Sequence, residues 1–305
     1  MKREDILVGA RDLKNELRRA EELRIIDASM IMYPALFDGN YKLDNGYQNY
    51  LNGHVPGSRY VNLLETMSEK TEEFQFYHLP DQVLRNALLR LDVSDLHRVV
   101  VYDCSNGVWA ARLYWQLRAI GMDCRILDGG WKQWVIDGGR IETGDQNGTY
   151  CKTHPITEPP SSSPQRRAAP EEFWSSKQEV KRVMEGKADG ALACALSPKM
   201  FQGKLPSRYA RRGHIPNSLN IPAFTLYDGY GKFLDKNMLK EIFGQTVGYD
   251  LHKRVIVYCG SGISAAIVAI ALTLADYSNV AIYDGSIQEW AMDMSLPMVS
   301  ETSHG

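Results

Sequence analysis

The feature that most constrains the fold is an internal repeat, because the second half of the chain repeats the first. The run Arg98–Tyr102 (Arg-Val-Val-Val-Tyr) recurs 156 residues later as Arg254–Tyr258 (Arg-Val-Ile-Val-Tyr). The other matched pairs are Gly53-His54-x-Pro56 with Gly213-His214-x-Pro216, Asp128-Gly129 with Asp284-Gly285, and Trp134 with Trp290. Similarity at so many positions is the signature of duplicated structural units. The 305 residues are therefore predicted to form two homologous domains of ordinary size.

Each half carries the pattern of an α/β domain. In the first half, β-branched strand patterns at 24–28 and 99–103 alternate with helical patterns at 10–23 and 108–120. Strands that alternate with helices favour a mainly parallel sheet flanked by helices. We predict this architecture for both halves.

A change of composition separates the two halves. From about residue 138 to 170, Thr, Ser, Pro, Gly and Asn dominate and no hydrophobic period survives. Helical periodicity returns over 171–184. We therefore place a first domain at 1–140, a linker at 141–169 and a second domain at 170–305.

The composition limits the kinds of binding partner and the cellular location that we expect for the protein. A net charge of −2 and an isoelectric point of about 6.4 give no electrostatic case for binding nucleic acid or an anionic membrane. The longest apolar run, 267–275, is too short to span a bilayer, and residues 1–5 lack the features of a signal or transit peptide. The five scattered cysteines show neither a disulfide framework nor metal-ligand spacing. We expect a cytoplasmic protein without a metal site.

A candidate nucleophile follows the second copy of the repeated strand. Cys259 comes directly after the β-branched run, and an apolar helical pattern begins a few residues later. The loop between them is Gly260, Ser261, Gly262, Ile263 and Ser264. Amides of such a loop and a helix N-terminus favour negative charge, and the thiolate is the nucleophilic form of cysteine. A buried structural cysteine is the alternative, but the two glycines, which let a ligand approach the backbone, favour a reactive one.

Two other anion-binding loops fit less well. A nucleotide-binding P-loop ends in Gly-Lys-Ser/Thr, and this loop has no lysine. A cysteine phosphatase needs an arginine for its phosphate dianion, and no arginine occurs between Cys259 and Thr273. The loop therefore suits a small or monoanionic group such as a persulfide.

The repeat indicates different roles for the two domains. When Tyr102 and Tyr258 are aligned, Asp103 falls where Cys259 stands. The first domain thus carries a carboxylate at the position of the nucleophile and is expected to be non-catalytic. Cys104, one residue later, is interpreted as a packed small side chain rather than a second reactive thiol. The other thiols expected in the core are Cys124 and Cys194.

With these features the chain resembles the tandem-domain rhodanese superfamily, specifically its 3-mercaptopyruvate sulfurtransferase-like branch, over nearly its whole length. The run 259–265 (Cys-Gly-Ser-Gly-Ile-Ser-Ala) is similar to that branch's Cys-Gly-Ser/Thr-Gly-Val-Thr-Ala. The thiosulfate-preferring branch carries Arg and Lys after its cysteine, where this chain has Gly260 and Ser261. Supporting matches are the two Gly-His-x-Pro turns, Tyr77-His78-Leu79-Pro80, and Asp128-Gly129-Gly130 with Trp134. The resemblance implies two rhodanese-like α/β domains with an active site at their interface.

The resemblance also implies a sulfurtransferase that works in two half-reactions. Cys259 takes a sulfur atom from a small donor, 3-mercaptopyruvate first and thiosulfate second, and becomes a persulfide. A thiol acceptor, such as thioredoxin or a low-molecular-weight thiol, or cyanide then removes the outer sulfur. Neither a metal nor an organic cofactor is needed. A different class, a low-turnover sulfur-carrier or redox-regulatory module fed by a protein partner, stays open.

Individual side chains receive roles from the same resemblance. The loop amides, with Gly260, Gly262, Ile263 and Ser264 as binding residues, are expected to hold the persulfide. Ser261 matches the family's loop hydroxyl, which polarises the donor.

The family also uses a His and an Asp of the first domain. His54 matches the His, and Asp44 is the nearest candidate for the Asp. A His in such a turn also serves to anchor its loop by hydrogen bonds. For His54 both roles stay open, and for His214 anchoring is favoured.

A donor carboxylate calls for arginine, because the planar guanidinium binds it through two hydrogen bonds. Arg208 matches one of two family arginines, whereas Met200 stands where the other is found, and Lys199 offers a positive charge one position earlier. This departure leaves the identity of the donor open. Arg211 and Arg212 are expected on the solvated surface.

Overall fold

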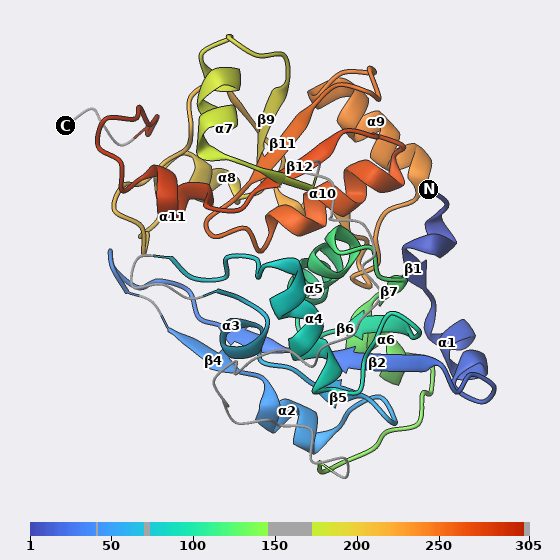
Figure 1. The fold of residues 1–305 in the computed structure, drawn as a ribbon. Coiled ribbons are helices and arrows are strands. Elements are labelled where there is room, and N and C mark those ends of the chain that lie inside the picture. The colour runs from blue at the N-terminus through green and yellow to red at the C-terminus, as the bar shows by residue number, and fades with distance from the viewer. Residues whose placement is uncertain (41, 70–73, 146–172, 302–305) are drawn as a thin grey trace.

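The computed structural model describes residues 1–40, 42–69, 74–145 and 173–301. These residues form two α/β units of the same design, and Figure 1 shows the first unit (blue to green) beneath the second (yellow to red). Each unit is built on a five-stranded sheet in which all neighbouring strands are parallel. The predicted fold class, two tandem α/β domains with mainly parallel sheets flanked by helices, is confirmed.

The strands of the first unit are β1 (Leu7–Val8), β2 (Leu23–Asp27), β3 (Met30–Met32), β4 (Leu43–Asn45), β5 (Arg59–Tyr60), β6 (Arg98–Tyr102) and β7 (Cys124–Leu127). Its helices are the 3-10 helix η1 (Arg3–Asp5), α1 (Ala10–Glu16), α2 (Tyr47–Asn52), α3 (Leu63–Thr66), α4 (Asp81–Leu89), α5 (Val108–Ala119) and α6 (Gly130–Ile136). The sheet order is β1-β7-β6-β2-β5, and β3 and β4 form a separate antiparallel hairpin. In the sheet centre, Val100 pairs with Ile25 on one side and Arg125 on the other.

The second unit repeats this topology. Its strands are β8 (Trp174–Ser175), β9 (Ala191–Cys194), β10 (Ser218–Asn220), β11 (Val255–Tyr258) and β12 (Val280–Tyr283). Its helices are α7 (Lys177–Met184), α8 (Pro198–Phe201), the 3-10 helix η3 (Ala223–Leu226), α9 (Lys236–Thr246), α10 (Ala265–Leu274) and α11 (Ser286–Trp290). The order β8-β12-β11-β9-β10 matches β1-β7-β6-β2-β5, so β11 is the counterpart of β6 and lies in the centre of its sheet. The repeat seen in the sequence is therefore a repeat of structure.

The helices α5 and α10 pack against each other where the two units meet (Figure 1). α10 is buried along nearly its whole length, because its sequence, Ala-Ala-Ile-Val-Ala-Ile-Ala-Leu-Thr-Leu, carries no charge. One hydrophobic cluster continues from the first unit through this helix pair into the second. Neither α10 nor any other helix in the described ranges is both long and apolar enough to cross a membrane. The loop before α10 is thus held at the domain boundary.

Two elements differ from the sequence-based predictions. The helix expected over 10–23 is limited to α1, and the chain then turns into β2. The helix expected over 171–184 begins only at Lys177, because Trp174 pairs with Ile282 and starts the edge strand β8. Ser176 then caps α7 by accepting a hydrogen bond from the amide of Glu179 at 3.2 Å.

The predicted linker is described only at its beginning. His54 and Glu142 form a β-bridge, and the Gly144 amide donates to the Leu51 carbonyl at 2.8 Å, so 141–145 packs against the first domain. The rest of the predicted linker, 146–169, lies outside the described residues, as does Cys151. The domain boundaries at 140 and 170 stay predictions.

Candidate active site

The loop between β11 and α10 begins with Cys259, which has 2% of its surface exposed. Close contacts explain the glycines beside it. A Cβ at Gly260 would lie 1.8 Å from the Tyr209 hydroxyl oxygen. At Gly262, whose φ is +75°, a Cβ would lie 2.7 Å from a carboxylate oxygen of Asp284. The loop therefore needs glycine at both positions to pack against its two neighbouring segments.

Ser286 fixes the shape of this loop from the start of α11. Its Oγ accepts hydrogen bonds from the amides of Cys259 at 3.2 Å and Gly262 at 3.1 Å, and it donates to the Tyr283 carbonyl at 2.8 Å. Its φ of 50° is uncommon for a residue with a side chain. Local strain at Ser286 thus accompanies a hydroxyl that holds two amides of the loop.

Four other amides of the loop have no protein partner. Within the described part of the chain, no group accepts a hydrogen bond from the backbone N–H of Gly260, Ser261, Ile263 or Ser264. Buried amides are almost always paired with protein, water or ligand. These four are therefore available to a bound anion.

The first domain shows what such a loop holds. The carboxylate of Asp103, at the position equivalent to Cys259, is fully buried and accepts hydrogen bonds from four amides of the following loop and the first turn of α5. The donors are Ser105 at 2.8 Å, Gly107 at 3.0 Å, Trp109 at 3.0 Å and Ala110 at 2.9 Å. Burial raises the pKa of Asp103, and the four amides oppose that rise. In the first domain, amides of the loop and of the first turn of the central helix thus converge on the carboxylate at the end of the central strand.

Two half-buried side chains, those of Arg208 and Tyr209, contact the Cys259 loop. Arg208 donates from Nη2 to the Ser261 hydroxyl oxygen at 2.7 Å, and its guanidinium lies 4.9 Å from the centre of the Tyr209 ring. Burial raises the pKa of Tyr209, so its hydroxyl stays protonated and can donate. The loop thus has a fixed cation, two hydroxyls and four unpaired amides around one thiol.

Two other thiols are surrounded by protein in a way that opposes their ionisation. Cys194 ends β9, lies beside Tyr258 of β11 and is fully buried, and this burial raises its pKa to about 12. Cys104 is half-buried, burial raises its pKa, and the Asn49 side-chain amide lies 3.5 Å from its sulfur. Both thiols are thus held in the protonated, unreactive form at neutral pH.

Comparison with known proteins places these features in one family. The sequence profile described as "Rhodanese-like domain" matches residues 10–137 and 202–293. The chain belongs to the rhodanese family.

Relatives of this rhodanese carry sulfurtransferase names. A protein of Mycobacterium tuberculosis, "Putative thiosulfate sulfurtransferase SseB", is 30% identical over 97% of both chains. The "3-mercaptopyruvate sulfurtransferase" of Escherichia coli is 32% identical over 91% of this chain and 92% of its own. The crystal structure of SseA from Escherichia coli, whose description refers to 3-mercaptopyruvate sulfotransferases, superposes with a TM-score of 0.71 at 30% identity and covers 92% of this chain and 98% of that one. The rhodanese described here is accordingly an enzyme of the sulfurtransferase type.

The structure brings together most of the predicted site residues of the rhodanese. Cys259 and Ser261 belong to the loop after β11, and Arg208 reaches this loop from the segment before β10. The remaining predicted loop residues at this place are Gly260, Gly262, Ile263 and Ser264. His54, Asp44 and Lys199 are not joined to them by any recorded contact among the described residues.

His54 lies inside the first domain and is held by its own turn. Its Nδ1 lies 2.8 Å from the Tyr50 carbonyl oxygen, and the two rings stack with centroids 3.9 Å apart. His214 repeats the arrangement in the second domain, with Nδ1 2.8 Å from the Phe201 carbonyl oxygen and a stacked Phe201 ring. These matched contacts support the loop-anchoring alternative for both histidines.

Asp44 and Lys199 are both on the surface. Asp44 lies in β4, its side chain is 49% exposed, and the Lys42 ammonium is 3.7 Å from its carboxylate. Lys199 is exposed on α8, next to the half-buried Met200. The structure thus leaves Arg208 as the predicted anion-binding side chain that contacts the loop.

The expectation of a solvated surface position is wrong for Arg211, whereas Arg212 does lie at the surface with a side chain that is 35% exposed. Arg211 donates to four backbone carbonyls around the end of α11, those of Trp290, Ala291, Asp293 and Leu296. Arg212 pairs with Asp38 of the first domain at 2.6 Å. Arg211 thus organises the polypeptide around the end of α11, a role that requires contacts between distant segments.

Sequence reasoning missed two residues of the loop environment, Tyr209 and Ser286. Tyr209 gave no signal except its place after Arg208. Ser286 stands 156 residues after Gly130, and both have a positive φ, 57° for Gly130 and 50° for Ser286. The replacement of the first copy's Gly130 by Ser286 in the second copy indicated in the sequence that a side chain has a role at this position.

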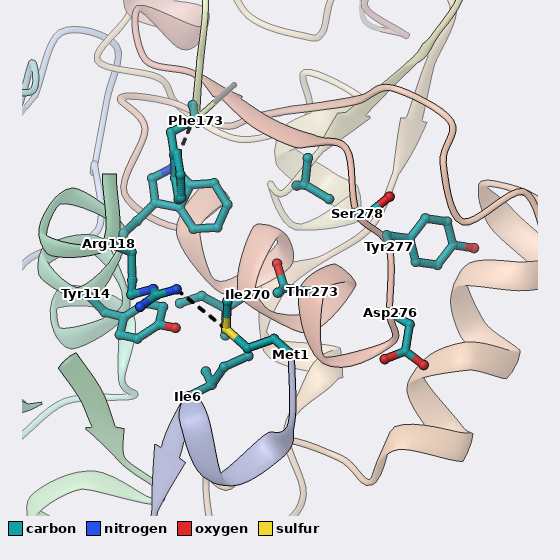
Figure 2. A pocket seen from close by; sticks show the side chains of 12 residues that line it. Met1, Ile6, Tyr114, Arg118, Phe173, Ile270, Thr273, Asp276, Tyr277 and Ser278 are labelled. Carbon is teal, nitrogen blue, oxygen red and sulfur yellow. Dashed lines mark hydrogen bonds between the residues drawn. The ribbon is translucent and has the colours of Figure 1, made fainter. Parts of the chain in front are cut away.

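A cavity lies at the C-terminal halves of α5 and α10, away from the Cys259 loop, which precedes the N-terminus of α10 (Figure 2). It has a volume of about 270 Å³, and its lining includes Tyr114 and Arg118 of α5 and Ile270 and Thr273 of α10. Cys259 precedes the N-terminus of α10, and a ten-residue helix is roughly 15 Å long. The cavity lining contains none of the predicted site residues, so the cavity is separate from the Cys259 loop.

Proposed function

We propose that this rhodanese transfers a sulfur atom from a small anionic donor to an acceptor through a persulfide on Cys259. The observation that carries the proposal is the amide cradle at the end of the central strand. The first domain fills its cradle with the Asp103 carboxylate, whereas in the second domain the equivalent position is Cys259 and four amides are unpaired. A loop that stabilises an internal anion in one copy is suited to anionic sulfur in the other.

The reaction consists of two displacements at sulfur. In the first, the Cys259 thiolate attacks the transferable sulfur of the donor, a sulfur–sulfur bond forms, and the donor's bond to that sulfur breaks. The electron pair leaves on the donor fragment, as sulfite from thiosulfate or as pyruvate enolate, which then takes up a proton, from 3-mercaptopyruvate. In the second step an acceptor thiolate or cyanide attacks the outer sulfur, and Cys259 leaves as the thiolate.

The backbone amides and the side chains at the loop have different roles in this reaction. The amides of Gly260, Ile263 and Ser264 stabilise the outer sulfur as its charge develops. Arg208 binds the anionic part of the donor, and its hydrogen bond to Ser261 orients the hydroxyl that polarises the donor.

We propose 3-mercaptopyruvate as the favoured donor and thiosulfate as the second. The loop sequence and Arg208 support the first, because the loop lacks the two cations expected after the cysteine for thiosulfate. Met200, in the place of a second arginine, and the exposed Lys199 weaken the carboxylate site. His54 and Asp44 remain weaker candidates for a part in the reaction.

The proposed acceptor is a thiol, such as thioredoxin or a low-molecular-weight thiol, or cyanide. Attack on a persulfide requires only a thiolate or cyanide, so this chemistry calls for no metal or organic cofactor. A reducing cytoplasm, inferred from the composition, would supply such thiols.

Intact-mass measurement tests the proposal. The protein is incubated with each donor, and its mass is compared with that of Cys259→Ser and of Cys104→Ser treated in the same way. We expect wild type and Cys104→Ser to gain the mass of one sulfur atom and Cys259→Ser to gain none. An adduct that persists in Cys259→Ser would overturn the proposal.

A low-turnover sulfur carrier or redox-regulatory module is the second candidate. The observation that favours it is the weakened anion site at Met200 and Lys199, since such a loop could accept sulfur mainly from a protein partner. It predicts persulfide formation with a cysteine desulfurase but negligible turnover of small donors. A kcat/KM of roughly 10⁴ M⁻¹s⁻¹ or above for a small donor would exclude it.

A further inference from the structure

A buried ion pair joins the two domains next to the Cys259 loop. Arg112 of α5 has no exposed surface, and its Nη1 lies 2.7 Å from a carboxylate oxygen of Asp284 in the second domain. His78 of the first domain supplies a backbone amide and Nδ1, each 2.7 Å from the other carboxylate oxygen. Burial alone would raise the pKa of Asp284, but Arg112 and His78 hold it below its ordinary value. The carboxylate is therefore ionised at neutral pH and keeps Arg112 in place.

Arg112 also reaches the catalytic loop itself. From the same Nη1 it donates to the carbonyl oxygen of Gly262 at 3.3 Å. In a trans peptide the carbonyl and the following N–H point in opposite directions. A hydrogen bond that draws the Gly262 carbonyl towards Arg112 therefore turns the Ile263 N–H away from Arg112.

The first domain shows where that amide should point. Gly107, which stands 156 residues before Ile263, donates its N–H to the carboxylate of Asp103 at 3.0 Å. In that domain the side chain of Asp103 fixes the peptide by itself. A thiol accepts hydrogen bonds only weakly, so the second loop lacks such an internal anchor until the sulfur is charged.

The two copies of the repeated aspartate use different cations. Asp128 is the counterpart of Asp284, and it accepts from the Phe233 amide at 3.0 Å and pairs with Arg3 at 2.9 Å. Arg3 donates to carbonyls of the second domain, those of Phe233 and Leu234, and within the described residues it makes no hydrogen bond to the Cys259 loop. The contact with the loop is thus particular to Arg112.

We propose that Arg112 is a positioning residue for sulfur transfer: it holds the Gly262–Ile263 peptide so that the Ile263 amide faces the sulfur of Cys259. The first domain, which lacks a nucleophile, thereby contributes to the reaction through a buried side chain. The inference rests on the proposed function, since it assigns to Arg112 the orientation of an amide that stabilises the persulfide.

The pH profile of Cys259 alkylation in Arg112→Met tests this role. Methionine preserves most of the buried volume and removes the charge and the donor. We expect the midpoint of the alkylation rate against pH to rise by about one pH unit, and donor-dependent persulfide formation at pH 7 to slow about tenfold. A lost packing contact alone would lower the melting temperature without moving the pH midpoint.

Arg3→Met is the matched control, because it removes the cation of the equivalent aspartate at the same interface. We expect it to lower the melting temperature and to leave the alkylation profile of Cys259 unchanged. If Arg112→Met does not fold, Arg112→Lys replaces it, since an ammonium can pair with Asp284 but cannot also hold the Gly262 carbonyl in the same geometry. An alkylation profile like that of wild type in the folded Arg112 variant overturns the inference. Absence of a sulfur adduct on wild type would instead contradict the proposed function.

Discussion

Asp103 and Cys259 occupy equivalent positions directly after the two central strands, and the Asp103 carboxylate accepts four amide hydrogen bonds from the following loop and the first turn of α5. One copy of the duplicated fold has therefore closed its anion site with a side chain. The other has the sulfur of Cys259 there, which would gain and lose negative charge in the reaction that we propose. The same backbone arrangement thus binds an internal carboxylate in the first domain and, in the proposed function, a reacting sulfur in the second.

Removal of the Asp103 carboxylate should destabilise the protein. Asp103→Ala leaves four buried amides without an acceptor, and we expect the free energy of unfolding to fall by about 3–5 kcal/mol. Asp103→Asn retains one acceptor oxygen, and its loss should be smaller, about 1–2 kcal/mol. Urea denaturation of the three proteins measures both changes. Equal stability of Asp103→Ala and wild type would contradict the anion-site interpretation of the loop.

The hydroxyl of Ser286 should matter for sulfur transfer through the two amides that it holds. Ser286→Gly removes the acceptor and suits the positive φ, so we expect little change in melting temperature but a fall in kcat/KM of about tenfold. Ser286→Ala removes the acceptor and keeps the strain, so it should lose both activity and stability. Steady-state assays and thermal unfolding separate the two variants. Full activity in Ser286→Gly would show that the loop keeps its shape without this hydroxyl.

Long apolar patterns made the framework predictable. β6, β11, α5 and α10 each contain an uninterrupted run of buried residues. Such buried runs are mainly apolar in sequence, and this made the four elements recognisable. β8 was missed because a two-residue edge strand has no period of its own. It exists through its pairing with β12, which local sequence does not encode.

The candidate site was predictable only where it is local. The loop from Cys259 to Ser264 is continuous, so its residue types alone indicated an anion site. Arg112 and Asp284 meet only because two domains dock, and Asp284 appeared in the sequence merely as a marker of the repeat. Arg211 was misjudged for the same reason, since its four carbonyl partners are grouped by the fold.

Asp27 should make stability depend on pH. Asp27 ends β2, is fully buried, and accepts from the Ser29 amide at 2.9 Å, and burial raises its pKa to about 6. Because the unfolded chain releases this proton near pH 4 and the folded chain holds it to about pH 6, stability falls as pH rises through this window. A pKa difference of about two units corresponds to about 3 kcal/mol.

The variant Asp27→Asn cannot ionise, so it should lack this fall and be the more stable protein at pH 7. Urea denaturation from pH 4 to pH 8 measures the difference, with exposed Asp12→Asn as a control for a general change of charge. Parallel stability curves for wild type and Asp27→Asn across this range would contradict the prediction.

Arg208 should distinguish the two donors. Its planar guanidinium matches a carboxylate through two hydrogen bonds, whereas the tetrahedral sulfonate end of thiosulfate depends less on that geometry. A lost hydrogen bond to a charged group costs about 1.5–3 kcal/mol, so Arg208→Ala should raise the KM for 3-mercaptopyruvate by roughly ten- to a hundredfold and that for thiosulfate much less. Arg212→Ala removes the same charge from a neighbouring residue that pairs with Asp38, and it should change neither KM by more than about twofold. Equal increases for both donors in Arg208→Ala would mean that Arg208 acts as a general cation and that the donor carboxylate is bound elsewhere.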